Sequence, residues 1–325
     1  MKNNNKYNQD LFHFLKKFSL ALIIPLPLLL LYLIEDPFRV IHRSYPFVIN
    51  KSTYPFNRGY LSLMAYERGR ESYRYDSFIL GNSQCMVLDT KLWEDAVTMP
   101  GKAIQMHASQ ETIEGIYNKI RYIKSKGDTI RNIIIGTYCY ADAPVQKTIP
   151  YRMPWQISSE SPVSFHWYYF SQFLRYSLFR QNIVRHFGVE DKEAKSIFAF
   201  YVDSVDQRHN QFFSSYKPYT NMPENPGGFI EIECDFPSER IALLKAIESE
   251  IRNSNYTIVF FPRRDLKVPS QETITLFESI FSKDRVLDLS RDSVAFSYSD
   301  FYDDVHFNNE TGRILTQKII SHYEH

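Results

Sequence analysis

The chain has 325 residues, of which 44% are hydrophobic and 23% are charged, and its formal net charge is +1. This balance excludes an intrinsically disordered chain, and a net charge near zero provides no basic surface for nucleic acid. Three cysteines without a C-x-x-C pair exclude a disulfide framework and the zinc-ribbon spacing. The length suits one large α/β domain or two small ones.

The chain begins with a predicted membrane anchor. Residues 1–17 carry four lysines, and residues 18–34 form the uncharged run FSLALIIPLPLLLLYLI. Seventeen such residues lie near the lower limit for a helix that spans a bilayer. Because the lysines precede the run, we expect a cytosolic tail over 1–17, a single anchor in the cytoplasmic membrane over 18–34, and an extracytoplasmic body. A cleaved signal peptide and a buried core helix are the alternatives.

After a predicted juxtamembrane linker over 35–75, the body from 76 to 325 alternates strands and helices. Short apolar runs predict buried strands at 77–81, 131–138, 256–262 and 286–289, with a weaker candidate at 94–99. Apolar residues at helical spacing predict helices at 109–126, 237–252, 271–282 and 309–322. This alternation predicts an α/β domain with a mainly parallel sheet and helices on both faces.

An aromatic-rich segment at about 145–225 interrupts this alternation. Apolar residues at helical spacing predict one or two amphipathic helices over 164–187. Two readings stay open. The segment is either a cap with a small core of its own, or an insertion that faces a substrate, a lipid or a partner protein.

The first candidate motif joins a strand to a turn. The run Asp76-Ser-Phe-Ile-Leu-Gly81-Asn-Ser83 predicts that a buried strand ends at Gly81 and places Ser83 at the start of a short helix, at the carboxyl edge of the sheet. Backbone N–H groups at a helix start can stabilise a developing oxyanion. A plain turn, with Ser83 as the helix cap, is the alternative.

The second candidate motif, Asp303-Asp-Val-His306, lies just before the final helix. In an Asp-x-x-His spacing, one turn presents both side chains, so the carboxylate can hold one imidazole nitrogen while the other faces a serine. A solvated loop is the alternative. In a doubly wound sheet, a segment after the first strand and one before the last helix fall on the same edge, so we expect the two motifs to meet.

Together these motifs resemble the SGNH (GDSL-like) hydrolase superfamily, over about residues 76–140 and 256–322. The resemblance implies a three-layer, flavodoxin-like sheet in which Ser83 is the nucleophile, His306 the general base and acid, and Asp303 the residue that orients the imidazole. With an anchor before the domain, the chain is similar to the membrane-anchored branch that includes alginate O-acetylation and teichoic-acid D-alanylation proteins. Proteins of that branch act outside the membrane beside a polytopic acyltransferase.

The sequence departs from the family pattern in two blocks. The third block of the family carries an Asn after the third strand, whereas this chain has Gly136-Thr-Tyr138-Cys139 there. In the second block, both Gly101 and Ser109 are candidates for the position that completes the oxyanion hole beside the Ser83 N–H. Tyr138 and Arg263 are further candidates for contact with substrate, and a disulfide between Cys85 and Cys139 is an open alternative.

The expected function is an acyltransferase or esterase that acts on O-acyl groups, acetyl above all, of a cell-surface polysaccharide. The expected partners are this acylated glycan, the membrane and a polytopic membrane O-acyltransferase. A catalytically inactive scaffold that binds glycan or such an acyltransferase is the alternative, which the missing Asn favours, and a simple lipolytic esterase is a third reading. The sequence has no HExxH metal motif, Walker loop or Rossmann glycine fingerprint, so we expect no metal and no cofactor.

Overall fold

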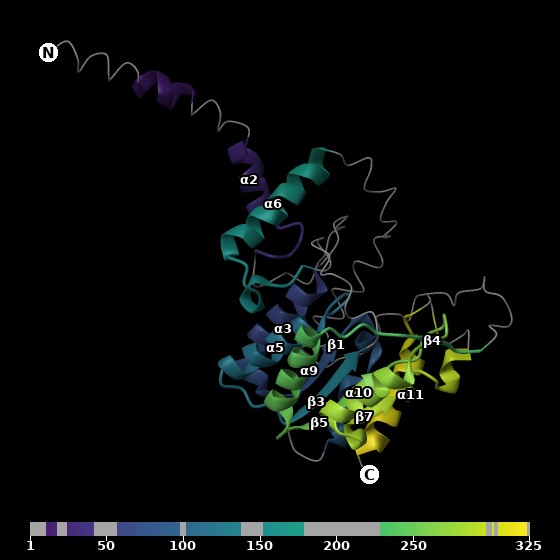
Figure 1. Ribbon diagram of the computed structural model, residues 1–325. Helices are drawn as coiled ribbons and strands as arrows, with labels where there is room; N and C mark the ends of the chain where they lie inside the picture. Colours follow the sequence, from purple (N-terminus) through teal and green to yellow (C-terminus); the bar gives the residue numbers. More distant parts are fainter. Residues whose placement is uncertain are drawn as a thin grey trace.

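The core of the protein is a parallel β-sheet of five strands (Figure 1). The computed structural model describes residues 11–17, 25–41, 57–97, 102–137, 152–178, 228–296, 301 and 305–323. The strands are β1 (Tyr75–Gly81), β2 (Lys102–His107), β3 (Asn132–Thr137), β5 (Asn255–Phe260) and β7 (Val286–Asp288). They lie in the order β2-β1-β3-β5-β7. Counted by themselves, these strands have the order 2-1-3-4-5, the doubly wound order whose switch point lies between β1 and β3.

Helices cover both faces of this sheet. Alternate residues of β1 point to opposite faces: Phe78 and Leu80 belong to one apolar cluster and Ile79 to another. The first cluster is closed by α3 (Arg58–Tyr73), α5 (Ile113–Ser125), α9 (Ser238–Ile251) and α10 (Gln271–Phe281). The second is closed by α4 (Thr90–Ala96) and α11 (Asn309–Tyr323). The expected α/β architecture with a parallel sheet between helical layers is therefore confirmed.

Two elements differ from the sequence-based expectation. The second strand is β2 at 102–107 and not the run at 94–99, most of which lies in helix α4 or outside the described residues. Asp89 caps α4 by accepting the Leu92 N–H, which starts a helix where the apolar run suggested a strand. In addition, α3 lies inside the predicted linker, yet nine of its residues are buried, so the body begins before residue 76.

A small parallel pair of strands stands apart from the main sheet. It consists of β4 (Ile230–Ile232) and β6 (Lys267–Pro269). β4 begins shortly after residues 179–227, which lie outside the described part of the chain, as do the last residues of the helical segment predicted at 164–187.

Two further helices, α2 (Pro25–Glu35) and α6 (Pro162–Leu178), lie side by side next to the sheet body (Figure 1). The ring of Tyr32 on α2 packs against Phe170 and Phe173 of α6, at centroid distances of 5.5 and 5.6 Å. Of the predicted anchor, residues 18–24 lie outside the described residues. Within the described part of the chain, no helix is both long enough and apolar enough to cross a membrane.

Candidate active site

The carboxyl end of β1 turns sharply into a short 3-10 helix, η1 (Ser83–Val87). Gly81 has a φ of +131°, a conformation that side-chain-bearing residues rarely adopt, and a Cβ there would collide with the Gly136 carbonyl oxygen. Asn82 then caps η1, because its side-chain oxygen accepts the Gln84 N–H at 2.9 Å. The Gly-Asn-Ser run therefore sets Ser83 at the edge of the sheet, where it is half-buried.

The loop before α11 carries His306 to the same edge. Phe301 and Phe307 form an antiparallel bridge, and their buried rings lie 4.8 Å apart. The Asn308 side-chain oxygen accepts the Thr311 N–H at 2.8 Å, so Asn308 caps α11. The two residues that follow His306 are therefore fixed, Phe307 as a buried ring and Asn308 as a helix cap.

Ser83 and His306 meet at this edge. The His306 Nε2 lies 2.7 Å from the Ser83 Oγ, although 223 positions separate the two residues in the chain. α11 can approach η1 this closely because it has Gly312 where a side chain would collide with the Val87 backbone. With Nε2 facing the serine, Nδ1 is the nitrogen that a carboxylate would hold in a Ser-His-Asp arrangement.

Gln84 connects the η1 turn that carries Ser83 to the loop that carries His306. Sequence reasoning missed this role. The Gln84 side-chain amide donates to the Val305 carbonyl and to the Pro262 carbonyl, each at 3.2 Å. The residue after the serine therefore holds the residue before the histidine, and it also holds the segment just after β5. Gln84 is only 2% exposed, so these bonds lie away from water. The only signal for this role in the sequence was a polar residue directly before the apolar run Cys85-Met-Val87.

Of the other predicted site residues, one lies at the same sheet edge, one forms an ion pair, and the rest lie outside the described residues. Ser109 lies just past β2, and the preceding Ala108 donates its N–H to the Gly81 carbonyl at 3.0 Å, so Ser109 belongs to the same sheet edge. Arg263 makes a bidentate ion pair with Asp265, at 2.8 and 2.6 Å. Its charge is therefore matched within the chain. The remaining candidates lie outside the described residues: Asp303, Gly101 and Tyr138.

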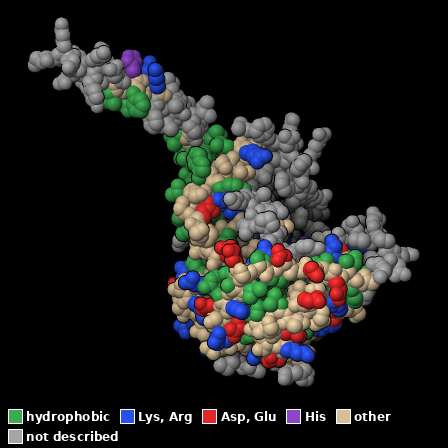
Figure 2. Space-filling model, viewed as in Figure 1, with side chains coloured by type: hydrophobic (Ala, Val, Ile, Leu, Met, Phe, Trp, Pro, Cys, Tyr) green, Lys and Arg blue, Asp and Glu red, His purple; other side chains and the backbone are tan. Residues whose placement is uncertain are grey.

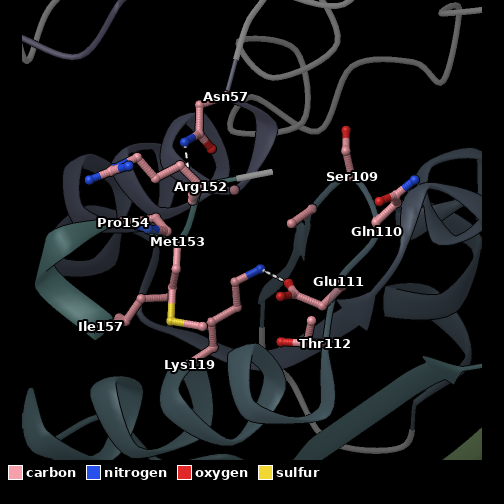
Figure 3. A pocket seen from close by; sticks show the side chains of 12 residues that line it. Asn57, Ser109, Gln110, Glu111, Thr112, Lys119, Arg152, Met153, Pro154 and Ile157 are labelled. Atoms are coloured by element: carbon pink, nitrogen blue, oxygen red, sulfur yellow. Dashed lines mark hydrogen bonds and ion pairs between the residues drawn. The ribbon is translucent and has the colours of Figure 1, made fainter. Parts of the chain in front are cut away.

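Ser109 lines a small, partly open pocket beside this edge (Figure 3). A buried ion pair crosses its floor, where the Lys119 ammonium donates to Glu111 and also to the Met106 carbonyl, the latter at 2.6 Å. Burial raises the pKa of Glu111, and the neighbouring Lys119 opposes this shift. On the opposite wall, Arg152 pairs with Glu160. Each charged side chain that lines this pocket thus has an ion-pair partner within the chain.

Two buried titratable groups lie next to the Ser83 turn. Burial raises the pKa of Cys85 to about 12, so this thiol stays protonated and does not compete with Ser83 as a nucleophile. Cys85 is a free thiol, which overturns the disulfide with Cys139 as an alternative. Burial, together with the charges of Arg58, Lys119 and His306, holds the pKa of His107 well below 6.5.

Chemically, the arrangement pairs a serine hydroxyl with an imidazole that can take its proton, at the switch-point edge where α/β sheets bind ligands. Within the described residues, no group of three His, Cys, Asp or Glu side chains is placed to hold a metal ion. The chain matches no model of a known protein family, and no curated protein is significantly similar to it in sequence.

Proposed function

We propose that this protein is a membrane-attached serine acyltransferase or ester hydrolase of the SGNH type, which acts on O-acyl groups of a cell-surface polysaccharide. The observation that carries the proposal is the 2.7 Å approach of the His306 Nε2 to the Ser83 Oγ at the carboxyl edge of a parallel sheet. The strand order 2-1-3-4-5 supports a flavodoxin-like, SGNH-like form of the fold.

In the proposed reaction, Ser83 Oγ attacks the acyl carbonyl carbon while His306 Nε2 takes the hydroxyl proton. The Ser83 N–H and a donor from the Ser109 loop stabilise the oxyanion. The Gln84 N–H is already used by Asn82, so it is not available for this purpose. The C–O bond to the leaving alcohol then breaks, His306 returns the proton to that oxygen, and the acyl group stays on Ser83.

In the second half of the reaction, a sugar hydroxyl attacks the acyl-Ser83 ester while His306 removes its proton. The bond between the acyl carbon and Ser83 Oγ then breaks, and His306 returns the proton to Ser83 Oγ, which completes transfer to the sugar. Water in the same position gives hydrolysis. Asp303 is proposed to hold the imidazole Nδ1, on the strength of the Asp-x-x-His spacing.

Two observations support an extracytoplasmic, membrane-attached body. Residues 18–34 have no charge and follow a tail with four lysines. Cys234 is disulfide-bonded. Disulfides form and persist in oxidising compartments, and they are rare where thiols are kept reduced. A glycan substrate and a polytopic acyltransferase partner fit this location.

A fluorophosphonate probe tests the nucleophile directly. The full chain, solubilised in detergent, is treated with the probe, and the labelled peptide is identified by mass spectrometry. We expect a single adduct on Ser83 that is lost in Ser83→Ala and retained in Ser279→Ala, where the exposed hydroxyl lies on α10. Thermal unfolding of both variants checks that the fold is intact.

The alternative reading, a scaffold without catalysis, rests on the missing third-block Asn. Absence of any Ser83 adduct in a folded chain, together with no turnover of acetyl esters, contradicts the enzyme and favours the scaffold. Turnover of short acyl esters without transfer to any added polysaccharide favours the lipolytic esterase.

A further inference from the structure

The α2–α6 pair exposes apolar side chains that the sheet body does not cover. On α2, six large aliphatic residues are exposed: Leu26, Leu29, Leu30, Leu31, Leu33 and Ile34. At 100° per residue they span an arc of about 200°, and the buried Tyr32 points the other way, towards α6. A helix that packs on a protein surface hides a stripe of roughly 100°, so this arc is wider than a single protein contact requires.

A second apolar stripe lies on α6 and continues the first. Val163 and Trp167 are 79% and 67% exposed, whereas Phe170, the next residue at helical spacing, is buried against α2 and Leu174 is partly buried. We call the exposed residues Val163 and Trp167 the outer stripe of α6; at 100° per residue they lie about 40° apart around the helix. The Trp167 ring lies 5.8 Å from Phe170, whose ring in turn packs on Tyr32 of α2. Figure 2 shows apolar side chains gathered on this part of the molecule.

The opposite face of α6 is packed. Phe165 and Tyr169 are fully buried, and the Phe165 ring stacks on Tyr60 of α3 at 5.6 Å. Asn57, the cap of α3, donates to the Tyr169 hydroxyl at 2.7 Å. α6 is therefore fixed to the sheet body through one face, and its outer stripe is left facing away from the core.

We propose that the outer stripe of α6 lies in the surface of the lipid bilayer, next to α2, as a second membrane contact. Three features favour lipid as the occupant: the arc on α2 is too wide for one partner helix, the preceding residues 18–24 carry no charge, and the outer stripe has a tryptophan, which prefers the membrane interface. The proposal rests on the membrane attachment proposed above and is independent of the serine chemistry.

Tryptophan fluorescence tests this placement. The chain has three tryptophans, of which Trp93 is fully buried and Trp155 partly buried, so Trp167 is the exposed one. The full chain is reconstituted into phosphatidylcholine vesicles with and without bromine on the acyl chains. We expect bromine to quench the emission, and we expect Trp167→Phe to remove most of that quenching while the protein still floats with the vesicles.

A cysteine pair provides the second readout. In the same vesicles, we expect Val163→Cys to react with a water-soluble maleimide at least about tenfold more slowly than Glu239→Cys, which sits at an exposed position on α9. Quenching that persists unchanged in Trp167→Phe, or no quenching in a chain that floats, overturns the proposal. Protection of Val163→Cys without quenching also overturns it, since it would indicate that a second copy of the chain covers α6. Ser83 labelling, tested separately, is unaffected by either outcome.

Discussion

The edge of the sheet around Ser83 and the α2–α6 pair use their apolar residues in opposite ways. At the sheet edge, Phe301 and Phe307 are buried, and polar groups such as Gln84 are buried with hydrogen-bond partners. On α2 and α6, leucines, Val163 and Trp167 are exposed. The first region therefore holds a fixed geometry for chemistry, whereas the second provides a surface. The following predictions test this division of roles, from the largest expected effect to the smallest.

His306→Ala should lower acyl-ester turnover by about 10⁴-fold or more, because it removes the imidazole that lies 2.7 Å from the Ser83 Oγ and takes its proton. The half-buried imidazole contributes little to the core, so the thermal midpoint should stay within a few degrees of that of the parent. Steady-state kinetics and a thermal melt measure the two effects. A large fall in the midpoint would instead indicate that His306 is a structural residue.

Phe165→Ala should cost about 3–5 kcal/mol of unfolding free energy, because the ring is fully buried on the packed face of α6. Val163→Ala, two residues earlier on the outer stripe, should change it by less than about 0.5 kcal/mol. Denaturant unfolding of the detergent-solubilised chain compares the two variants. Equal losses of unfolding free energy in the two variants would mean that the outer stripe is also packed against protein. The two faces of α6 would then not differ in the way described above.

Gln84→Leu should lower kcat by roughly ten- to a hundredfold with little change in KM, because the loop that carries His306 loses its bond to the turn that carries Ser83. The rate of fluorophosphonate labelling should fall in parallel. The conservative variant Gln84→Asn, with a shorter amide, should fall between Leu and the parent. A normal labelling rate in a less stable protein would make Gln84 a purely structural residue.

The stability of the fold should decline as the pH falls below about 6.5. The pKa of His107 is held well below its ordinary value in the folded chain, so only the unfolded chain takes up this proton. The unfolded chain then binds one more proton than the folded chain, so the free energy of unfolding falls by about 1.4 kcal/mol for each pH unit below about 6.5. Denaturant unfolding at pH 7.5, 6.5 and 5.5 should give a shallower decline for His107→Gln. Identical slopes would exclude His107 as the source.

Much of the sheet could be predicted from the sequence, because β1, β3 and β5 are apolar runs bounded by polar or turn residues. β2 was missed because Gln105 and His107 look like surface residues, although both are buried. The Gln105 side-chain amide donates a hydrogen bond to the Leu88 carbonyl at 2.6 Å. No local sequence pattern indicates this partner. α3 was missed because charged residues and two glycines hide its apolar spacing at Tyr60, Leu63 and Met64.

The site divides in the same way. Ser83 and His306 were predictable because each belongs to a local motif and because parallel topology brings the carboxyl ends of strands together. The role of Gln84 could not be predicted, because its partners are backbone carbonyls about 180 and 220 positions away in the chain. Every residue has a backbone carbonyl, so the sequence does not indicate which ones a side chain will contact. The internal pairing of Arg263 with Asp265 also escaped notice, although only one residue separates them.

Asn57 links the two regions mechanically. Its side-chain amide contacts Tyr169 of α6 and the Arg152 carbonyl, while its oxygen accepts the Tyr60 N–H at the start of α3. Gly59, two residues on, lies against Ala108, which is hydrogen-bonded to the end of β1. With α6 resting on lipid as proposed, this short chain of contacts would set the height of the serine above the bilayer. Acceptors would then be selected by how far they reach from the membrane, before any recognition of their sugar units.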